Sequence, residues 1–247
     1  MDVQRIPALI IQTPNLDRFR PLFEILRTSE LLDPILLTAT MGDSLVVSNT
    51  KADEEEQSKY GRTLSKNERA CAISHSHARK IIAASSRGGI IFEDDARITD
   101  LTRLEESVLT FLAKNLHSSS ALGLLDYSVR LETNPKRNCQ IKFHRLLAET
   151  PLAVATALTP AAAKAMLYSA ASSSQTADWP KSKCKFFVMS NGCVLHGDST
   201  SGTTIGDPSM RVTGSNLNPF SLVGFKSSIH RTKQKLDTLI IAHRQSK

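Results

Sequence analysis

A short apolar run that ends in three consecutive carboxylates constrains this chain more than any other feature of its sequence. Ile90-Ile91-Phe92 leads directly into Glu93-Asp94-Asp95, and Arg87-Gly88-Gly89 precedes it as a helix stop. A continuous apolar run of this length predicts a buried strand. Three neighbouring carboxylates repel one another and are costly to bury unpaired. We therefore expect something positive to neutralise them at the end of this strand.

The segment before this strand predicts a capped helix over residues 65–86. Ser65 and Glu68 have the spacing of a capping box, in which each side chain satisfies the other residue's free backbone amide. Glu68 and His75 lie about two helical turns apart and so share a face. The residues expected on the apolar face of this helix are Cys71, Ser74, Ala78, Ile81 and Ile82.

The rest of the chain alternates expected strands and helices, which predicts an α/β fold with a mixed, mostly parallel sheet. The ligand crevice of such sheets lies at the carboxyl ends of the strands, where the three acids would emerge. We expect one domain over residues 1–215 and a basic tail or helix over residues 216–247. The further strands are expected at residues 8–11, 35–38, 121–125 and 152–158, the further helices at residues 16–26, at 100–115 and from Pro160, a turn at residues 135–138, and a hairpin of residues 186–189 with 193–196.

Charge and composition favour a soluble protein with anionic partners. The net charge is +7, and residues 226–247 hold six Lys or Arg against one acid, Asp237. This tail could attract an anionic membrane surface or remain a solvated tail. Nucleic-acid binding is not expected, because no aromatic residues alternate with the basic ones. The four cysteines form no CxxC pair, so we expect reduced thiols. No apolar run has the length of a signal peptide or a membrane span, so we expect a cytoplasmic location, peripheral at the inner membrane face at most.

The acidic cluster suggests a site for a hard divalent cation. Mg²⁺ and Mn²⁺ prefer oxygen ligands and often bridge carboxylates to substrate phosphates. A metal held by Asp94 and Asp95 would neutralise a leaving diphosphate as a Lewis acid. From these residues alone, a solvated acidic turn remains the alternative.

The helix and the strand together carry a resemblance to a known family. Residues 64–75, Leu-Ser-Lys-Asn-Glu-Arg-Ala-Cys-Ala-Ile-Ser-His, followed by residues 90–95, Ile-Ile-Phe-Glu-Asp-Asp, resemble glycosyltransferase family 25. This family contains the lipooligosaccharide β-galactosyltransferases and the collagen galactosyltransferases. Ala70 stands where the family usually has Gly, and Phe92 replaces its usual Leu. Asn15-Leu16-Asp17-Arg18 and residues 156–162 are similar to two further segments of the family.

The resemblance implies a GT-A-like, Rossmann-like domain that binds a nucleotide sugar. It implies an inverting hexosyltransferase that moves a hexose from a UDP-sugar donor to a hydroxyl of a cell-surface glycan or lipooligosaccharide. Galactose is the expected hexose. Asp94 and Asp95 would bind Mn²⁺ or Mg²⁺, and the metal would in turn bind the diphosphate. The other residues carried over for the nucleotide sugar are Thr13, Arg18, Glu68, Ser74, His75 and Glu93. An inverting transfer needs a general base, usually a carboxylate, and the candidates are Asp178, where the family usually carries an Asp, and Asp126.

Two other functions stay open on the sequence. A family member with a degraded site would act as a binding or scaffold protein, which the unmatched C-terminal third permits. A metal-dependent phosphoesterase would use the same acids, although such sites normally gather several His and Asp ligands from separate loops. The donor sugar, the acceptor and the linkage do not follow from the sequence.

Overall fold

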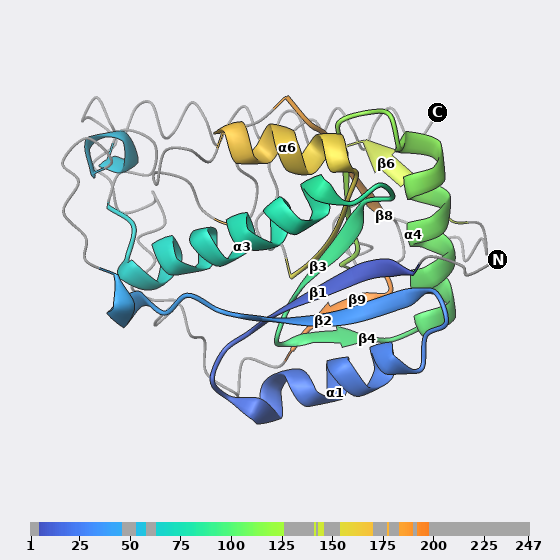
Figure 1. Cartoon of the computed structure of the whole chain (residues 1–247), viewed down its shortest axis with the longest axis horizontal. Coiled ribbons are helices and arrows are strands. Elements are labelled where there is room, and N and C mark those ends of the chain that lie inside the picture. Colours follow the sequence, from blue (N-terminus) through green and yellow to red (C-terminus); the bar gives the residue numbers. More distant parts are fainter. Residues whose placement is uncertain are drawn as a thin grey trace, which may run out of the picture.

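The computed structural model of the chain describes residues 5–45, 53–57, 63–125, 141, 143–145, 154–169, 177, 183–189 and 192–197. In this part of the chain, helices cover both faces of a central sheet (Figure 1). The α/β fold class predicted from the sequence is therefore confirmed. The expected turn at residues 135–138 and the expected tail at residues 216–247 lie outside the described residues.

The elements follow one another as strands and helices in near alternation. The strands are β1 (Ile6–Gln12), β2 (Leu32–Thr38), β3 (Gly89–Glu93), β4 (Ala96–Ile98), β5 (Ser120–Gly123), β6 (Phe143–Arg145), β7 (Ala155–Leu158), β8 (Lys185–Met189) and β9 (Val194–His196). The helices are α1 (Leu16–Arg27), α3 (Lys66–Ala84), α4 (Leu101–Asn115) and α6 (Pro160–Ser169), with a 3₁₀ turn η1 (Gly42–Ser44).

The large sheet has seven strands in the order β2-β1-β3-β7-β5-β8-β6. β1 is parallel to β2 and β3, and β5 is parallel to β8, whereas β7 and β6 are antiparallel to their neighbours. The sheet is therefore mixed, with most strands in one direction, as predicted. β2 starts at Leu32 and not at the predicted residue 35. The strand can include Pro34 because β2 lies at the edge of the sheet, where a proline is tolerated.

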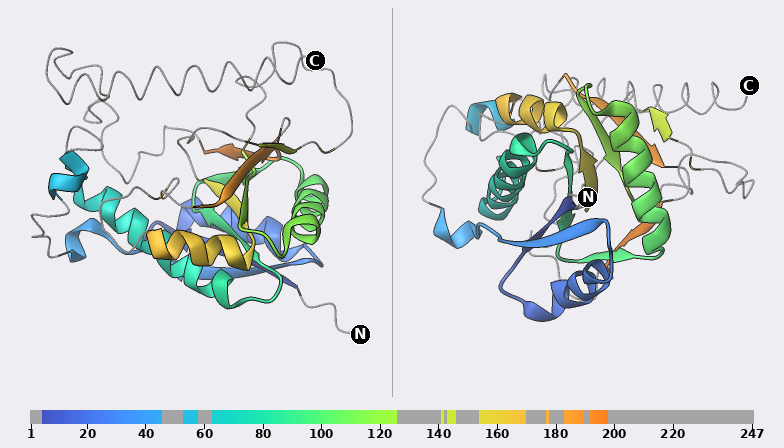
Figure 2. Two further views of the ribbon diagram at one scale, coloured as in Figure 1. Left: turned by 90° about the horizontal axis from the view of Figure 1, so that it is seen from above. Right: turned by 45° about the vertical axis from the view of Figure 1, so that its right-hand side comes forward.

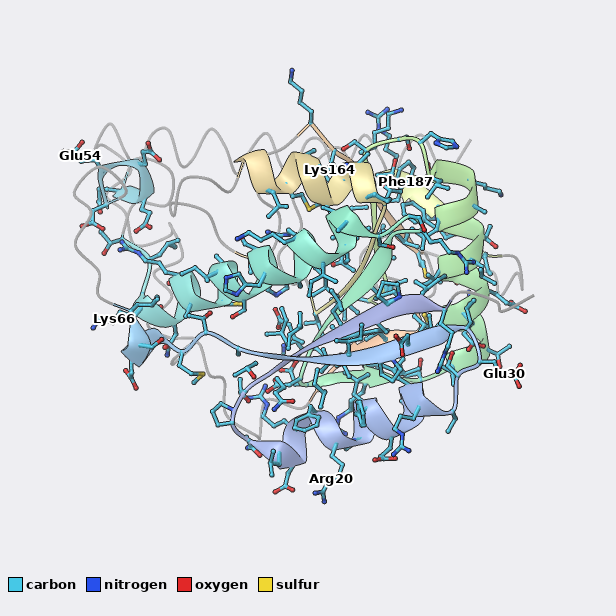
Figure 3. The ribbon with its side chains drawn as sticks, in the orientation of Figure 1. Arg20, Glu30, Glu54, Lys66, Lys164 and Phe187 are labelled. Carbon is cyan, nitrogen blue, oxygen red and sulfur yellow. The ribbon has the colours of Figure 1, made fainter. Side chains whose placement is uncertain are left out.

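Alternating side chains of the sheet build two apolar layers. Ala8 and Ile10 of β1 join the core under α1 and α4, whereas Leu9 and Ile11 join the core under α3 and α6. Figures 1 and 2 show α3 and α6 side by side on one face of the sheet. On the other face, Phe187 of β8 lies next to α4, with its ring centroid 5.8 Å from that of Phe111 (Figure 3).

The capping box predicted for α3 is present. The Ser65 side chain accepts a hydrogen bond from the Glu68 amide at 3.2 Å, and the Glu68 carboxylate accepts one from the Ser65 amide at 2.8 Å. The helix ends at Ala84, slightly before the predicted end. Ile81, expected on the apolar face, is instead 39% exposed, because it lies about 100° around the helix from the buried Ile82.

The predicted hairpin of residues 186–189 with 193–196 is wrong. β8 pairs with β5 and β6 inside the large sheet, and β9 pairs with β4 in a separate two-stranded sheet. The physical reason lies in the apolar run of β8, which is typical of an internal strand that is covered on both faces. β4 follows the acidic cluster directly, so this pairing brings β9 to the same place.

Two sequence-level expectations concern thiols and membranes. Cys71, Cys184 and Cys193 are free thiols in the described part of the chain, and Cys139 lies outside it. Within the part of the chain that the structure describes, every helix is too short or too polar to cross a membrane.

The capping box yields a first testable prediction. Ser65→Ala should lower the free energy of unfolding by about 1 kcal/mol, because the amide of Glu68 loses its acceptor at the start of α3. Urea denaturation measures this change. Ser86→Ala, at an exposed serine just after the same helix, is the control and should leave stability unchanged. Equal effects of the two substitutions would contradict a capping role for Ser65.

Candidate functional site

The carboxyl ends of β1 and β3 lie side by side, and this arrangement creates the site. Ile11 of β1 lies opposite Glu93 of β3 in the parallel register, so the residues that follow each strand meet. The amide of Thr13 donates a hydrogen bond to Asp94 Oδ2 at 3.1 Å, and the Thr13 hydroxyl donates to the same oxygen. The loop after β1 thereby holds the Asp94 carboxylate, which is nearly buried.

Arg18, in the first turn of α1, supplies positive charge to both aspartates. Its Nη2 lies 3.2 Å from Asp94 Oδ1 and 2.9 Å from Asp95 Oδ2, and only 9% of its side chain is exposed. Asn15 caps α1 by accepting a hydrogen bond from the Asp17 amide. Arg20 of the same helix points away from the sheet (Figure 3). Arg18 is therefore the positive partner that the acidic cluster was expected to need.

The end of β9 approaches Asp95 from the other side. The Gly197 amide donates to the Asp95 carbonyl at 2.8 Å, and a Cβ on Gly197 would lie only 2.6 Å from that oxygen, so glycine is required here. His196 Nε2 lies 3.6 Å from Asp95 Oδ2, and His196 Nδ1 lies 2.8 Å from the Gly197 carbonyl. A hydrogen on Nδ1 donates to that carbonyl, so Nε2 is the ring nitrogen that faces the carboxylate of Asp95.

Sequence reasoning missed His196. The predicted hairpin paired β9 with β8, which gives His196 no relation to the acids. The residue also lies about one hundred positions after Asp95 in the chain, with no motif around it. Only the pairing of β9 with β4 reveals the contact.

Asp95 is less completely neutralised than Asp94. Its Oδ1 is buried, and no hydrogen-bond donor among the described residues reaches it. Burial of the carboxyl raises the pKa of Asp95 above its usual value, and the negative charge of Glu93 adds to this, while His196 and Arg18 oppose it. The environment of Asp95 therefore favours an additional positive charge. Asp94, by contrast, has both oxygens in contact with Arg18 or Thr13.

The Glu93 side chain points towards α3, whereas Asp94 and Asp95 contact Arg18 of α1 on the opposite face of the sheet. Glu93 accepts a hydrogen bond from His75 Nε2 of α3 at 3.1 Å, and Cys71 Sγ lies 4.0 Å from the same oxygen. Burial raises the pKa of Glu93, but the hydrogen bond and charge of His75, with smaller effects from His196 and Arg18, outweigh it and hold the pKa below its usual value. The His75 side chain is only 2% exposed, so its described polar contact is with Glu93 and not with solvent.

The remaining predicted site residues lie elsewhere. Ser74 is buried, accepts a hydrogen bond from the Thr40 amide at 2.8 Å and donates to the Ala70 carbonyl. Glu68 caps α3 about 10 Å along the helix from His75. Neither side chain is brought to Asp94 and Asp95. Asp126 and Asp178, the candidate bases, lie outside the described residues.

A pocket of about 510 Å³ opens beside the acids, between α1 and β4. Arg18 and Asp95 form part of its wall, and Arg97 of β4 adds another basic side chain. The other lining residues are Asn15, Asp17, Pro21, Leu22, Ile25, Ala96, Ile98 and Gly197. The site therefore joins two carboxylates, basic side chains and a cavity at one edge of the sheet, where α/β proteins bind their ligands.

An acidic pair at the carboxyl edge of an α/β sheet, beside a pocket that carries both basic and acidic side chains, defines a class of ligand-binding site typical of α/β proteins. Comparison with known protein families identifies the class of protein. The family model of glycosyltransferase family 25 (LPS biosynthesis protein) matches residues 36–178, more than half of the chain. The chain belongs to this family, and it is a glycosyltransferase. A comparison with curated proteins finds no match. The matched span includes Asp94 and Asp95 but not Thr13, Arg18 or His196.

The different surroundings of the two aspartates predict different effects on stability. Asp94→Asn should lower the free energy of unfolding by about 1–3 kcal/mol, because the new amide cannot accept from Thr13 without turning its NH₂ group towards Arg18. Asp95→Asn should leave stability unchanged or raise it, since the ionised form of Asp95 is disfavoured where it stands. Thermal and urea unfolding of the metal-free proteins measure both. A larger loss for Asp95→Asn than for Asp94→Asn would contradict this assignment.

The lowered pKa of Glu93 predicts a pH dependence of stability. Because its pKa is lower in the folded protein than in the unfolded chain, the ionised carboxylate stabilises the fold above about pH 4.3 and loses this effect as the pH falls through the lowered pKa. The destabilisation by Glu93→Gln should therefore be larger at about pH 7 than at about pH 3. Urea denaturation at both pH values tests this, with Glu106→Gln, at an exposed position of α4, as the control. A destabilisation that does not change with pH would contradict the prediction.

Proposed function

We propose that this glycosyltransferase is an inverting, metal-assisted hexosyltransferase of GT-A-like fold. It transfers a hexose from a UDP-sugar to a hydroxyl of a lipooligosaccharide or another cell-surface glycan, and galactose is the proposed hexose. The observation that carries the proposal is the buried and incompletely neutralised carboxylate of Asp95, beside Arg18 and the pocket between α1 and β4. Membership of family 25 supports the choice of donor and acceptor.

The strand order supports a nucleotide-binding arrangement of the GT-A type. The parallel strands β2, β1 and β3 form the N-terminal half of the sheet, and the antiparallel β7 separates them from β5 and β8. The acids emerge where β3 ends next to this change of strand direction. In open α/β sheets, nucleotides bind at such an edge beyond the carboxyl ends of the strands.

The residues around Asp95 fit a hard divalent cation. Asp95 Oδ1 is a buried acceptor without a donor among the described residues, and Asp95 and His196 would hold Mn²⁺ or Mg²⁺ together. A histidine that binds a metal through one ring nitrogen usually donates the N–H of the other to a carbonyl or carboxylate oxygen. Asp94, proposed from the sequence as a second ligand, also positions Arg18 and the loop that carries Thr13. The cation would supply Lewis-acid neutralisation of the leaving diphosphate.

The protein's own groups would bind and orient the donor. Arg18 already stands beside both carboxylates and would contribute a positive charge to the diphosphate. The start of α1 faces the same pocket, and the positive end of a helix favours an anion. Thr13 and its loop would lie near the nucleotide. His75 and Glu93 would act from the other face of the sheet by fixing the end of β3.

An inverting transfer also needs a base that removes the proton of the acceptor hydroxyl as it attacks the sugar. Asp178, which sits where the family usually carries an Asp, and Asp126 remain the proposed bases. The net charge of +7 and the basic residues 226–247 suit a phosphorylated or acidic glycolipid acceptor at an anionic membrane surface.

The test is a donor screen with the full chain. UDP-galactose should be consumed and galactose transferred to a truncated lipooligosaccharide only when Mn²⁺ or Mg²⁺ is present, and chelation should abolish the activity. Asp95→Asn should reduce the rate by at least about 100-fold, as expected for the loss of a metal ligand. Glu24→Gln, at an exposed carboxylate of α1, should retain full activity.

Three results would contradict the proposal. Activity of Asp95→Asn equal to that of the unchanged protein would remove the acids from the mechanism. Binding of UDP-sugars without any turnover would favour a scaffold protein. Release of inorganic phosphate from simple esters, with no sugar transfer, would favour a phosphoesterase.

A further inference from the structure

A second group of metal-ligating side chains lies on the opposite face of β3 from Asp95. Cys71 and His75 of α3 and Glu93 of β3 each direct one ligand atom into the same small space. The sulfur of Cys71, Nε2 of His75 and one oxygen of Glu93 all lie within 4.8 Å of one another. Two of the separations are shorter, 3.1 Å from His75 Nε2 to Glu93 Oε1 and 4.0 Å from Cys71 Sγ to the same oxygen.

Helix and strand periodicity produce this group. Cys71 and His75 are four residues apart, so they lie one above the other on one face of α3. Glu93 lies two residues after Ile91, which packs into the core under α3 and α6, so its side chain points to the same face of the sheet. The three ligands therefore come from rigid elements and not from loops.

The chemical types of the ligands select a class of cation. A thiolate, an imidazole and a carboxylate together suit Zn²⁺ and similar borderline-soft ions, whereas a thiolate is a poor ligand for the hard ions Mn²⁺ and Mg²⁺. Bonds of about 2.0–2.3 Å to a tetrahedral Zn²⁺ place neighbouring ligand atoms roughly 3.3–3.8 Å apart. The separations of Cys71, His75 and Glu93 are within about 1 Å of this range.

Burial leaves a route for the ion. His75 is almost fully buried, but Glu93 keeps 22% of its side chain exposed and Cys71 is half-buried. A cation would arrive from the Glu93 side, at the sheet edge. Three protein ligands leave a fourth position for water or another group.

We propose that Cys71, His75 and Glu93 form a binding site for one Zn²⁺ ion or a similar borderline-soft divalent cation. On binding, the Cys71 thiol releases its proton to the solvent and binds as thiolate, and neutral His75 binds through Nε2. The charges of the thiolate and the Glu93 carboxylate then balance the dication. The site is separate from the hard cation proposed at Asp95, and it stands whether or not the proposed donor and acceptor are correct.

The test measures Zn²⁺ and Co²⁺ binding to the full chain after removal of metals with a chelator. Calorimetry should show a Zn²⁺ site whose affinity falls by at least about 100-fold in Cys71→Ser. Co²⁺ in the same site should give a thiolate-to-metal charge-transfer absorption that Cys71→Ser abolishes. Cys184→Ser, at another half-buried thiol, should leave both signals unchanged. Asp95→Asn should also leave them unchanged, which separates this site from the proposed catalytic one.

A folding control distinguishes loss of the metal site from loss of the fold. Cys71→Ser changes one atom, and a circular dichroism melt of the metal-free protein will show whether the fold persists. If that variant does not fold, Glu93→Gln provides the second ligand variant, with the same predicted loss of affinity. Absence of Zn²⁺ binding to the unchanged protein, or equal binding to Cys71→Ser, would overturn the proposal and leave a hydrogen-bonded trio without metal. Loss of Zn²⁺ binding in Asp95→Asn alone would overturn it as well, since the ion would then bind at the other face.

Discussion

The ion pair of Arg18 with Asp94 and Asp95 is the interaction on which the rest of the site depends. One guanidinium nitrogen lies within 3.2 Å of an oxygen of each carboxylate, in a setting where all three side chains are largely buried. Without this charge, the end of β3 would carry uncompensated carboxylates in a low-dielectric environment, at a cost of several kcal/mol. The pair also fixes α1 against the end of β3, and this placement forms the pocket between α1 and β4.

The end of β3 at Glu93 divides the acidic cluster between two environments. Glu93 still belongs to β3 and points to α3, where His75 hydrogen-bonds it and its pKa is lowered. Asp95 lies beyond the strand on the α1 side, where burial and the charge of Glu93 raise its pKa. Three consecutive carboxylates therefore have distinct chemical surroundings, and we assign them distinct roles. Asp95 is the acid best suited to a hard cation, while Glu93 lies among ligands for a softer one.

The sequence predicted the parts of this site that depend on local patterns. The capping box of Ser65 and Glu68, the apolar strand and the acids at its end all follow from spacings within a few residues, and the structure confirms them. Arg18 was expected in the site from the family resemblance, but its pairing with Asp94 and Asp95, 76 and 77 positions away, was not. Contacts of that kind depend on strand order. The same limit explains the wrong hairpin, because the apolar patterns of β8 and β9 do not specify which strands they join, and it explains why His196 was missed.

The central claim is that the acids at the end of β3 bind the metal and the diphosphate of the donor. Anomalous diffraction from crystals grown with Mn²⁺ and UDP tests it most directly, because it locates the manganese without reference to activity. We expect an anomalous peak beside Asp95 and His196, with the diphosphate next to Arg18. A manganese ion bound away from Asp95, with UDP held elsewhere on the sheet, would contradict it.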